Sequence, residues 1–183
     1  MQALDDLVRA GKVRYIGASA MYAWQLAKLQ HCATTNGWTR FVSMQNRYNL
    51  VNREDERELI PMCLDMGVGM LPYSPLARGL LAGTRNRSGE RRTKRSSTAS
   101  PDRPADFDVQ DAVLEAARHL DVPPARVAMA WLLHKPGICA PIVGATAPAH
   151  IADAIASLDV EVSEHLVSAL EDAYLPRLLS DFS

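Results

Sequence analysis

The sequence lacks any hydrophobic run that approaches the roughly 20 residues needed to cross a bilayer. It also lacks a signal peptide, because Met1 is followed by the segment QALDD and not by a basic and then apolar leader. We therefore expect a cytoplasmic protein that has no membrane partner.

The sequence has little net charge as well. Its 20 Lys and Arg residues are balanced by 21 Asp and Glu residues, which gives a net charge of −1 at pH 7. A surface built to bind nucleic acid carries a clear basic excess, so we expect no nucleic-acid partner. The 183 residues, 48% of them hydrophobic, are enough for a single domain with a real core.

Cysteine is scarce, with only Cys32, Cys63 and Cys139 in the whole sequence. The three are far apart and lie in apolar surroundings, without the spacing of a metal site. An odd number of cysteines does not suggest a disulfide framework. The sequence thus predicts no metal and three buried free thiols in a reducing cytoplasm.

What the sequence does contain is a regular alternation of strand and helix patterns. Strands are predicted over 12–19, 40–46, 68–71 and 138–143, and helices over 2–10, 24–36, 54–66, 109–120, 124–134, 148–158 and 163–173. Strands that alternate with helices form a parallel sheet through right-handed crossovers. The fold class is therefore α/β, in a single domain over residues 1–183.

Each predicted strand ends in polar or aromatic side chains. They are Ser19, Gln45, Tyr73 with Ser74, and Thr146. The carboxyl ends of parallel strands meet on one rim, where the loops of a βα barrel form the ligand site. After Tyr73 the chain bends at Pro75, and Gly79 allows a close approach of the backbone to a ligand. A plain proline-rich connection is the alternative interpretation of this segment.

The segment 84–106 interrupts the alternation. Between residues 85 and 103 it has seven basic and two acidic residues, a charge of about +5, and almost no apolar side chains. Such a composition cannot form a core and predicts a long, basic, flexible loop. The loop is either simply solvated or closes over an anionic ligand.

Four segments resemble the aldo-keto reductase family in content, order and spacing. They are GKVRYIGAS (11–19), QNRYNL (45–50), YSPLARGLL (73–81) and PIVGAT (141–146), within a match from about Leu4 to about Tyr174. The resemblance implies a TIM-barrel type (β/α)₈ fold, NADP(H) as cofactor and reduction of aldehydes or ketones. It covers the C-terminal half of the barrel, strands five to eight.

The family's catalytic Asp, Tyr, Lys and His lie on the first four strands, so the resemblance assigns no catalytic residue to this sequence. It does assign cofactor contacts. Ser19 and Gln45 correspond to residues that bond the nicotinamide carboxamide, although Ala20 stands where many relatives have Asn. Tyr73 corresponds to the ring that stacks on the nicotinamide. The positions over the pyrophosphate are Ser74, Leu76 and Gly79.

The adenosine end of the cofactor corresponds to the start of the helix predicted at Pro148. The matching residues are Gly144, Thr146, His150 and Asp153. A helix N-terminus offers free N–H groups and a positive dipole to a phosphate. Relatives often have Lys or Arg near here, where this sequence has Ala147 and His150, so NADP over NAD is implied by the family and not by these side chains. His150 is equally consistent with a surface histidine.

Three functional hypotheses follow. The first is an NADP-dependent oxidoreductase, which takes a small carbonyl substrate only when an N-terminal half completes the barrel. The second is a non-catalytic nucleotide-binding or scaffolding half-barrel, and the third is a truncated gene product. Four strands in half a barrel have two open edges, which predicts a homodimer through these edges. In that arrangement we expect Tyr15, Val42, Met44 and Met70 to face the uncovered side of the sheet.

Overall fold

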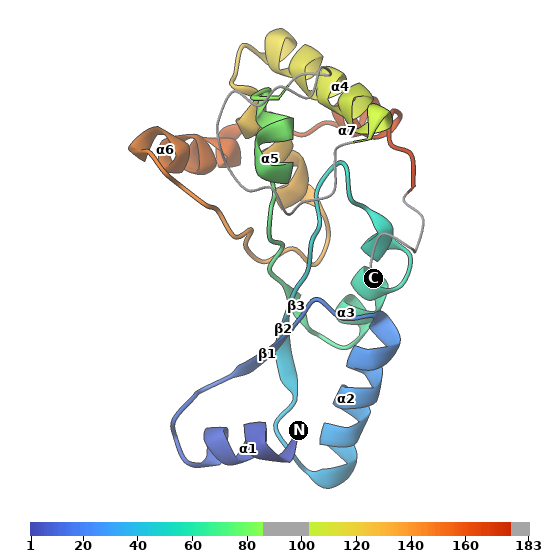
Figure 1. The fold of residues 1–183 in the computed structure, drawn as a ribbon, viewed down its shortest axis with the longest axis vertical. Coiled ribbons are helices and arrows are strands. Elements are labelled where there is room, and N and C mark those ends of the chain that lie inside the picture. Colours follow the sequence, from blue (N-terminus) through green and yellow to red (C-terminus); the bar gives the residue numbers. More distant parts are fainter. Residues whose placement is uncertain (86–102, 177–183) are drawn as a thin grey trace.

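The computed structural model describes residues 1–85 and 103–176. Within them lie β1 (Ile16–Ser19), β2 (Phe41–Gln45), β3 (Gly69–Met70), α1 (Gln2–Arg9), α2 (Ala23–Asn36), α3 (Leu59–Asp65), α4 (Pro104–Leu120), α5 (Pro124–His134), α6 (Pro148–Ala156) and α7 (Glu164–Glu171). Short 3₁₀ helices span Glu54–Glu56, Ala77–Ala82 and Ser157–Asp159. Figure 1 shows α1 and α2 at one end of the molecule and α4 to α7 at the other, with the strands between them.

The strands form one parallel sheet in the order β1-β2-β3, as the alternating pattern predicts. Ser19 pairs with Gln45 and Ser43 with Gly69, so the carboxyl ends of the strands lie at the same edge. The connection from β1 to β2 runs through α2, and the connection from β2 to β3 runs through α3. The sequence therefore predicts the α/β class and the parallel pairing correctly.

The fourth strand, predicted over 138–143, does not form as a regular strand. This segment makes two isolated parallel bridges, from Met70 to Ile138 and from Tyr73 to Ile142. The physical reason is the loss of donors, because Pro72 and Pro141 have no N–H and interrupt the ladder between the bridges. The Ile142 N–H still reaches the Pro72 carbonyl at 2.8 Å, so the segment stays beside β3.

The two faces of the sheet differ in composition. On one face Ile16, Ala18, Met44 and Met70 are buried in a single core, which includes Leu26 of α2. On the other face lie the small or polar residues of the strands, namely Gly17, Ser19, Ser43, Gln45 and Gly69. The prediction that Met44 and Met70 face the uncovered side is thus wrong. Tyr15 and Val42 are exposed, at 75% and 45%.

The helix boundaries also differ in part from the prediction. α4 begins at Pro104 and not at Val109, because the Asp106 carboxylate accepts from the Arg103 N–H at 2.9 Å and caps the first turn. Residues 104–106 of the predicted 84–106 loop are therefore helical, and residues 86–102 lie outside the described part of the chain. The predicted helix over 54–66 is divided into the Glu54–Glu56 turn and α3. α7 begins as predicted, with the Ser163 hydroxyl accepting from the Leu166 N–H.

All three cysteines are free, but only Cys63 is buried as predicted. Burial raises the pKa of the Cys63 thiol to about 11. Cys32 is half-buried and Cys139 is exposed, so the prediction of burial is wrong for these two.

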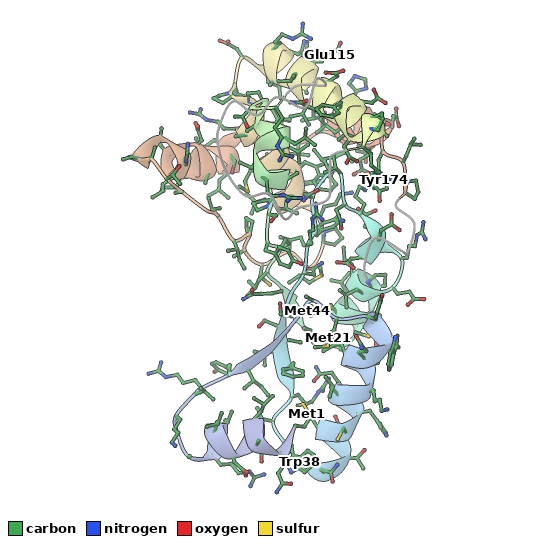
Figure 2. All side chains as sticks on the ribbon, viewed as in Figure 1. Met1, Met21, Trp38, Met44, Glu115 and Tyr174 are labelled. Carbon is green, nitrogen blue, oxygen red and sulfur yellow. The ribbon has the colours of Figure 1, made fainter. Side chains whose placement is uncertain are left out.

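A cluster of charged and aromatic residues joins the β2–α3 connection to α5 and α7. Arg53 bonds both carboxylate oxygens of Glu56, at 2.8 and 2.9 Å, and also bonds Glu171 of α7 at 2.5 Å. Glu171 in turn accepts from the indole of Trp131 at 2.7 Å and from Lys135. Tyr174, labelled at the α4–α7 end in Figure 2, donates to Glu54 at 2.6 Å. Through this cluster the sheet and the helical end are held together.

Candidate cofactor site

Ser19 and Gln45 lie side by side at the carboxyl edge of the sheet. The two residues are paired in register, and both are exposed on the face of the sheet that carries small residues. The Ala20 N–H bonds the Gln45 carbonyl at 2.9 Å, which extends the pairing by one residue. A hydroxyl and a carboxamide on paired residues of one sheet face can both hydrogen-bond an amide group placed over them. The pair therefore fits the carboxamide contact that the resemblance implies.

Tyr73 lies next to this pair along the same edge. Its N–H bonds the Asn46 carbonyl at 2.8 Å, and parallel bridges join it to Arg47 on one side and Ile142 on the other. The ring is half-buried and lines a cavity of about 570 Å³. The backbone around Tyr73 is thus paired on both sides, through the Tyr73 N–H on one side and the neighbouring Pro72 carbonyl on the other, with the Tyr73 side chain at the rim.

The cavity beside Tyr73 is lined by the β1–α2 loop, the end of β2 and the start of α3. Asn46, which is buried, and Asp55, which is half-buried, form a pair in its wall, with the Asn46 amide donating to the Asp55 carboxylate at 2.5 Å. Burial raises the pKa of Asp55, the Asn46 hydrogen bond opposes that rise, and the charge of Glu54 adds to it. The sequence pattern indicates neither residue as part of a site, apart from the position of Asn46 directly after Gln45.

The loop that follows Tyr73 adopts an unusual backbone. Ser74, Ala77 and Arg78 have φ values of 55°, 46° and 57°, and Gly79 has a φ of 93°. A Cβ atom at Gly79 would approach the Thr84 hydroxyl to 2.4 Å, so this position requires glycine. Leu76 is half-buried and packs against the core. Ser74, Leu76 and Gly79 therefore lie together in one tight turn beside Tyr73.

The residues predicted for the adenosine end form a separate group at the start of α6. The ring nitrogen Nδ1 of His150 accepts from the Thr146 N–H at 3.2 Å and lies 3.5 Å from its hydroxyl. Gly144, Thr146 and His150 are all exposed. Asp153 instead points to α5, where it forms an ion pair with Arg126 at 2.9 Å. The bridge from Tyr73 to Ile142 connects this group to the rim.

In the two ranges that the structure describes, no three His, Cys, Asp or Glu side chains are grouped to hold a metal ion. No helix within these ranges combines the length and apolar character that crossing a bilayer requires.

Comparison with known proteins shows the family to which the chain belongs. The family model for the aldo/keto reductase family matches residues 1–175. A Schizosaccharomyces pombe protein named "Putative aryl-alcohol dehydrogenase" is 44% identical over 181 residues, which are 96% of this chain and 50% of that protein. The versiconal hemiacetal acetate reductase of Aspergillus parasiticus is 42% identical over 187 residues, covering 98% of this chain and 53% of its own length.

An aldo-keto reductase of Fusarium vanettenii is 41% identical over 187 residues, with 100% of this chain and 50% of that protein covered. The chain thus spans about half the length of the curated relatives it matches. The family has a TIM-barrel fold, with which the parallel α/β sheet agrees. On the family match over residues 1–175, this chain belongs to the aldo/keto reductase family.

Proposed function

We propose that this chain supplies the NADP(H)-recognising rim of an aldo-keto reductase, corresponding to strands five to eight of the barrel. The observation that carries the proposal is the row formed by Ser19, Gln45 and Tyr73 along the carboxyl edge of one parallel sheet. In this row an amide-binding pair stands beside an aromatic ring, which is the combination a nicotinamide ring with its carboxamide requires.

The cofactor, when bound, supplies the hydride for carbonyl reduction. Ser19 and Gln45 would orient the carboxamide, Tyr73 would stack on the nicotinamide ring, and the Ser74–Gly79 turn would hold the pyrophosphate. Gly144, Thr146 and His150 would hold the adenosine end. Asp153 fits less well, because its carboxylate is already paired with Arg126.

Carbonyl reduction also needs a proton donor, and the resemblance assigns the family's catalytic residues to the other half of the barrel. A small aldehyde or ketone is therefore the proposed substrate only of a barrel completed by an N-terminal half. By itself, the chain is proposed to bind the cofactor in the cytoplasm.

The experiment is a titration of NADPH with the chain, followed by the fluorescence of the nucleotide. Tyr73→Ala is expected to weaken NADPH binding about tenfold, because base–aromatic stacking contributes on the order of 1–3 kcal/mol. Tyr15→Ala is the matched control, since Tyr15 is 75% exposed and precedes β1 at the far side of the sheet from the rim. Equal affinity of the wild type and Tyr73→Ala would contradict the proposed stacking.

A further inference from the structure

The turn after β3 has a backbone conformation that other groups must stabilise. Ser74, Ala77 and Arg78 all have φ between 46° and 57°. The left-handed region costs a non-glycine residue roughly 1–2 kcal/mol. Such a conformation persists only where neighbouring groups hold it.

Some of that support comes from within the turn. The Ala77 N–H bonds the Ser74 carbonyl at 3.0 Å, and both the N–H and the hydroxyl of Thr84 bond the Gly79 carbonyl, at 3.1 and 2.8 Å. These bonds fix the turn internally. They do not fix its position relative to β2, where Gln45 lies.

The side chain of Asn49 connects the turn to the segment that follows β2. Its Nδ2 donates to the Ser74 carbonyl at 2.8 Å, so that this carbonyl accepts from both Asn49 and Ala77. The Asn46 carbonyl anchors Tyr73 from the same segment. Two adjacent residues of the turn are therefore held by a segment that begins directly after β2.

Asn49 is itself firmly placed. Its side chain is fully buried, and its Oδ1 accepts from the Val51 N–H at 3.1 Å. Its backbone forms an antiparallel bridge with Asn52, with bonds of 3.2 and 2.9 Å. The orientation of the amide follows, because a flipped amide would place donor against donor at Val51 and acceptor against acceptor at Ser74.

We infer that Asn49 is a positioning residue for Tyr73 and Ser74, which it holds in register with the Ser19–Gln45 pair without touching the cofactor. The inference rests on the proposed function in one respect, namely that Tyr73 and Ser74 contact the nicotinamide and pyrophosphate. A loop held in this way presents the ring and the backbone at a fixed distance from Gln45 and loses less entropy on binding.

The test compares two ligands on the same variants. Asn49→Ala is expected to weaken NADPH about tenfold, because a buried hydrogen-bond partner is lost. Adenosine 2′,5′-bisphosphate, which lacks the nicotinamide end, is expected to bind unchanged. A merely structural role would weaken both ligands equally, and that result would overturn the inference, as would unchanged NADPH binding. Asn36→Ala is the matched control, since its amide bonds the Cys32 carbonyl on the surface of α2.

Asn49→Asp is the second variant, for the case in which Asn49→Ala does not fold. The aspartate retains the acceptor for the Val51 N–H and replaces the donor to Ser74 by an oxygen. It is therefore expected to weaken NADPH at least as much as Asn49→Ala, again without effect on the bisphosphate. NADPH affinity equal to that of the wild type would overturn the inference.

Hydrogen exchange separates this inference from the proposed function. In the wild type the side-chain amide protons of Asn49 should exchange slowly, and in Asn49→Ala the backbone N–H of Ala77 should exchange about tenfold faster while α5 is unchanged. Failure of the wild type to bind NADPH would refute the proposed function alone. Fast exchange of the Asn49 amide in the wild type would refute the positioning role.

Discussion

At the scale of single residues, the site is built from side chains whose partners are fixed by the backbone. The register of β1 and β2 positions Gln45. The hydrogen bond to the Asn46 carbonyl and the bridge to Ile142 position Tyr73. Ala20, like Ser74, is a rim residue with a strained backbone. Ala20 has a φ of 48° directly after Ser19, in a region that disfavours any side chain with a Cβ.

Ala20→Gly is therefore expected to stabilise the protein by about 0.5–1 kcal/mol, as relief of left-handed strain outweighs the greater freedom of glycine in the unfolded chain. Urea unfolding measures the change. Ala152→Gly in α6 is the control, because a glycine at an exposed position inside a helix should destabilise by about 1 kcal/mol. A loss of stability in Ala20→Gly would contradict the assigned strain.

Sequence reasoning identifies the rim residues but not the contacts that hold them. The polar strand ends Ser19, Gln45 and Tyr73 are visible as a pattern, because each follows an apolar run. The bond from Asn49 to Ser74 joins residues 25 positions apart through a side chain, and no local pattern encodes it. The sequence predicts the faces of Met44 and Met70 wrongly. The run around Met70 has no alternation that distinguishes its two sides. Before Met44, the pairing with β1 skips Val42, an irregularity that the sequence pattern does not indicate.

At the scale of elements, the cluster around Glu171 joins the β2–α3 connection to α5 and α7. Burial alone would raise the pKa of Glu171, but Lys135, Trp131 and Arg53 together lower it. A carboxylate whose pKa is lowered in the folded state stabilises the fold at pH values above its unfolded pKa of about 4.5. That contribution to stability is lost as the pH falls through the lower pKa that Glu171 has in the folded protein.

Glu171→Gln is accordingly expected to destabilise the protein at pH 7 by about 1–3 kcal/mol, since Arg53 and Lys135 lose a shared partner in a half-buried site. The difference between wild type and variant should shrink as the pH falls below about 4.5. Urea unfolding at several pH values measures it. Glu161→Gln, at an exposed position before α7, should change little, and a difference for Glu171→Gln that does not depend on pH would refute the assigned charge effect.

The elements also show where sequence patterns are insufficient. Capping residues predicted the start of α7 at Ser163, because that signal is local. The strand over 138–143 was predicted from its apolar content, yet Pro141 and the opposite Pro72 remove the donors that a continuous ladder needs. The sequence predicts the start of α4 five residues too late, because the Arg103–Asp106 cap lies in a segment whose composition is typical of a loop.

At the scale of the whole molecule, the sheet has one face that helices cover and one that carries small and polar residues. The exposed fraction is high for several apolar residues near its margins, including Tyr15 at 75%, Val42 at 45% and Ile142 at 41%. Open strand edges with such neighbours favour association. We propose that the chain forms a homodimer through the edges at β1 and at residues 138–143.

Light scattering across a range of concentrations tests the dimer. The proposal predicts a mass of about twice the 20.1 kDa of the chain, falling on dilution. Tyr15→Lys, which places a charge beside the β1 edge, should shift the equilibrium toward the monomer. A monomer at every concentration, with cooperative unfolding, would contradict the proposed assembly.

Nuclear magnetic resonance of the ¹⁵N-labelled chain tests whether NADP(H) binds along the carboxyl edge of the sheet. On addition of NADPH, we expect saturable shifts of the amides of Ser19, Gln45, Tyr73 and the Ser74–Gly79 turn, while α1 and α7 remain unchanged. Absence of shifts, or shifts confined to residues away from this edge, would contradict this mode of binding.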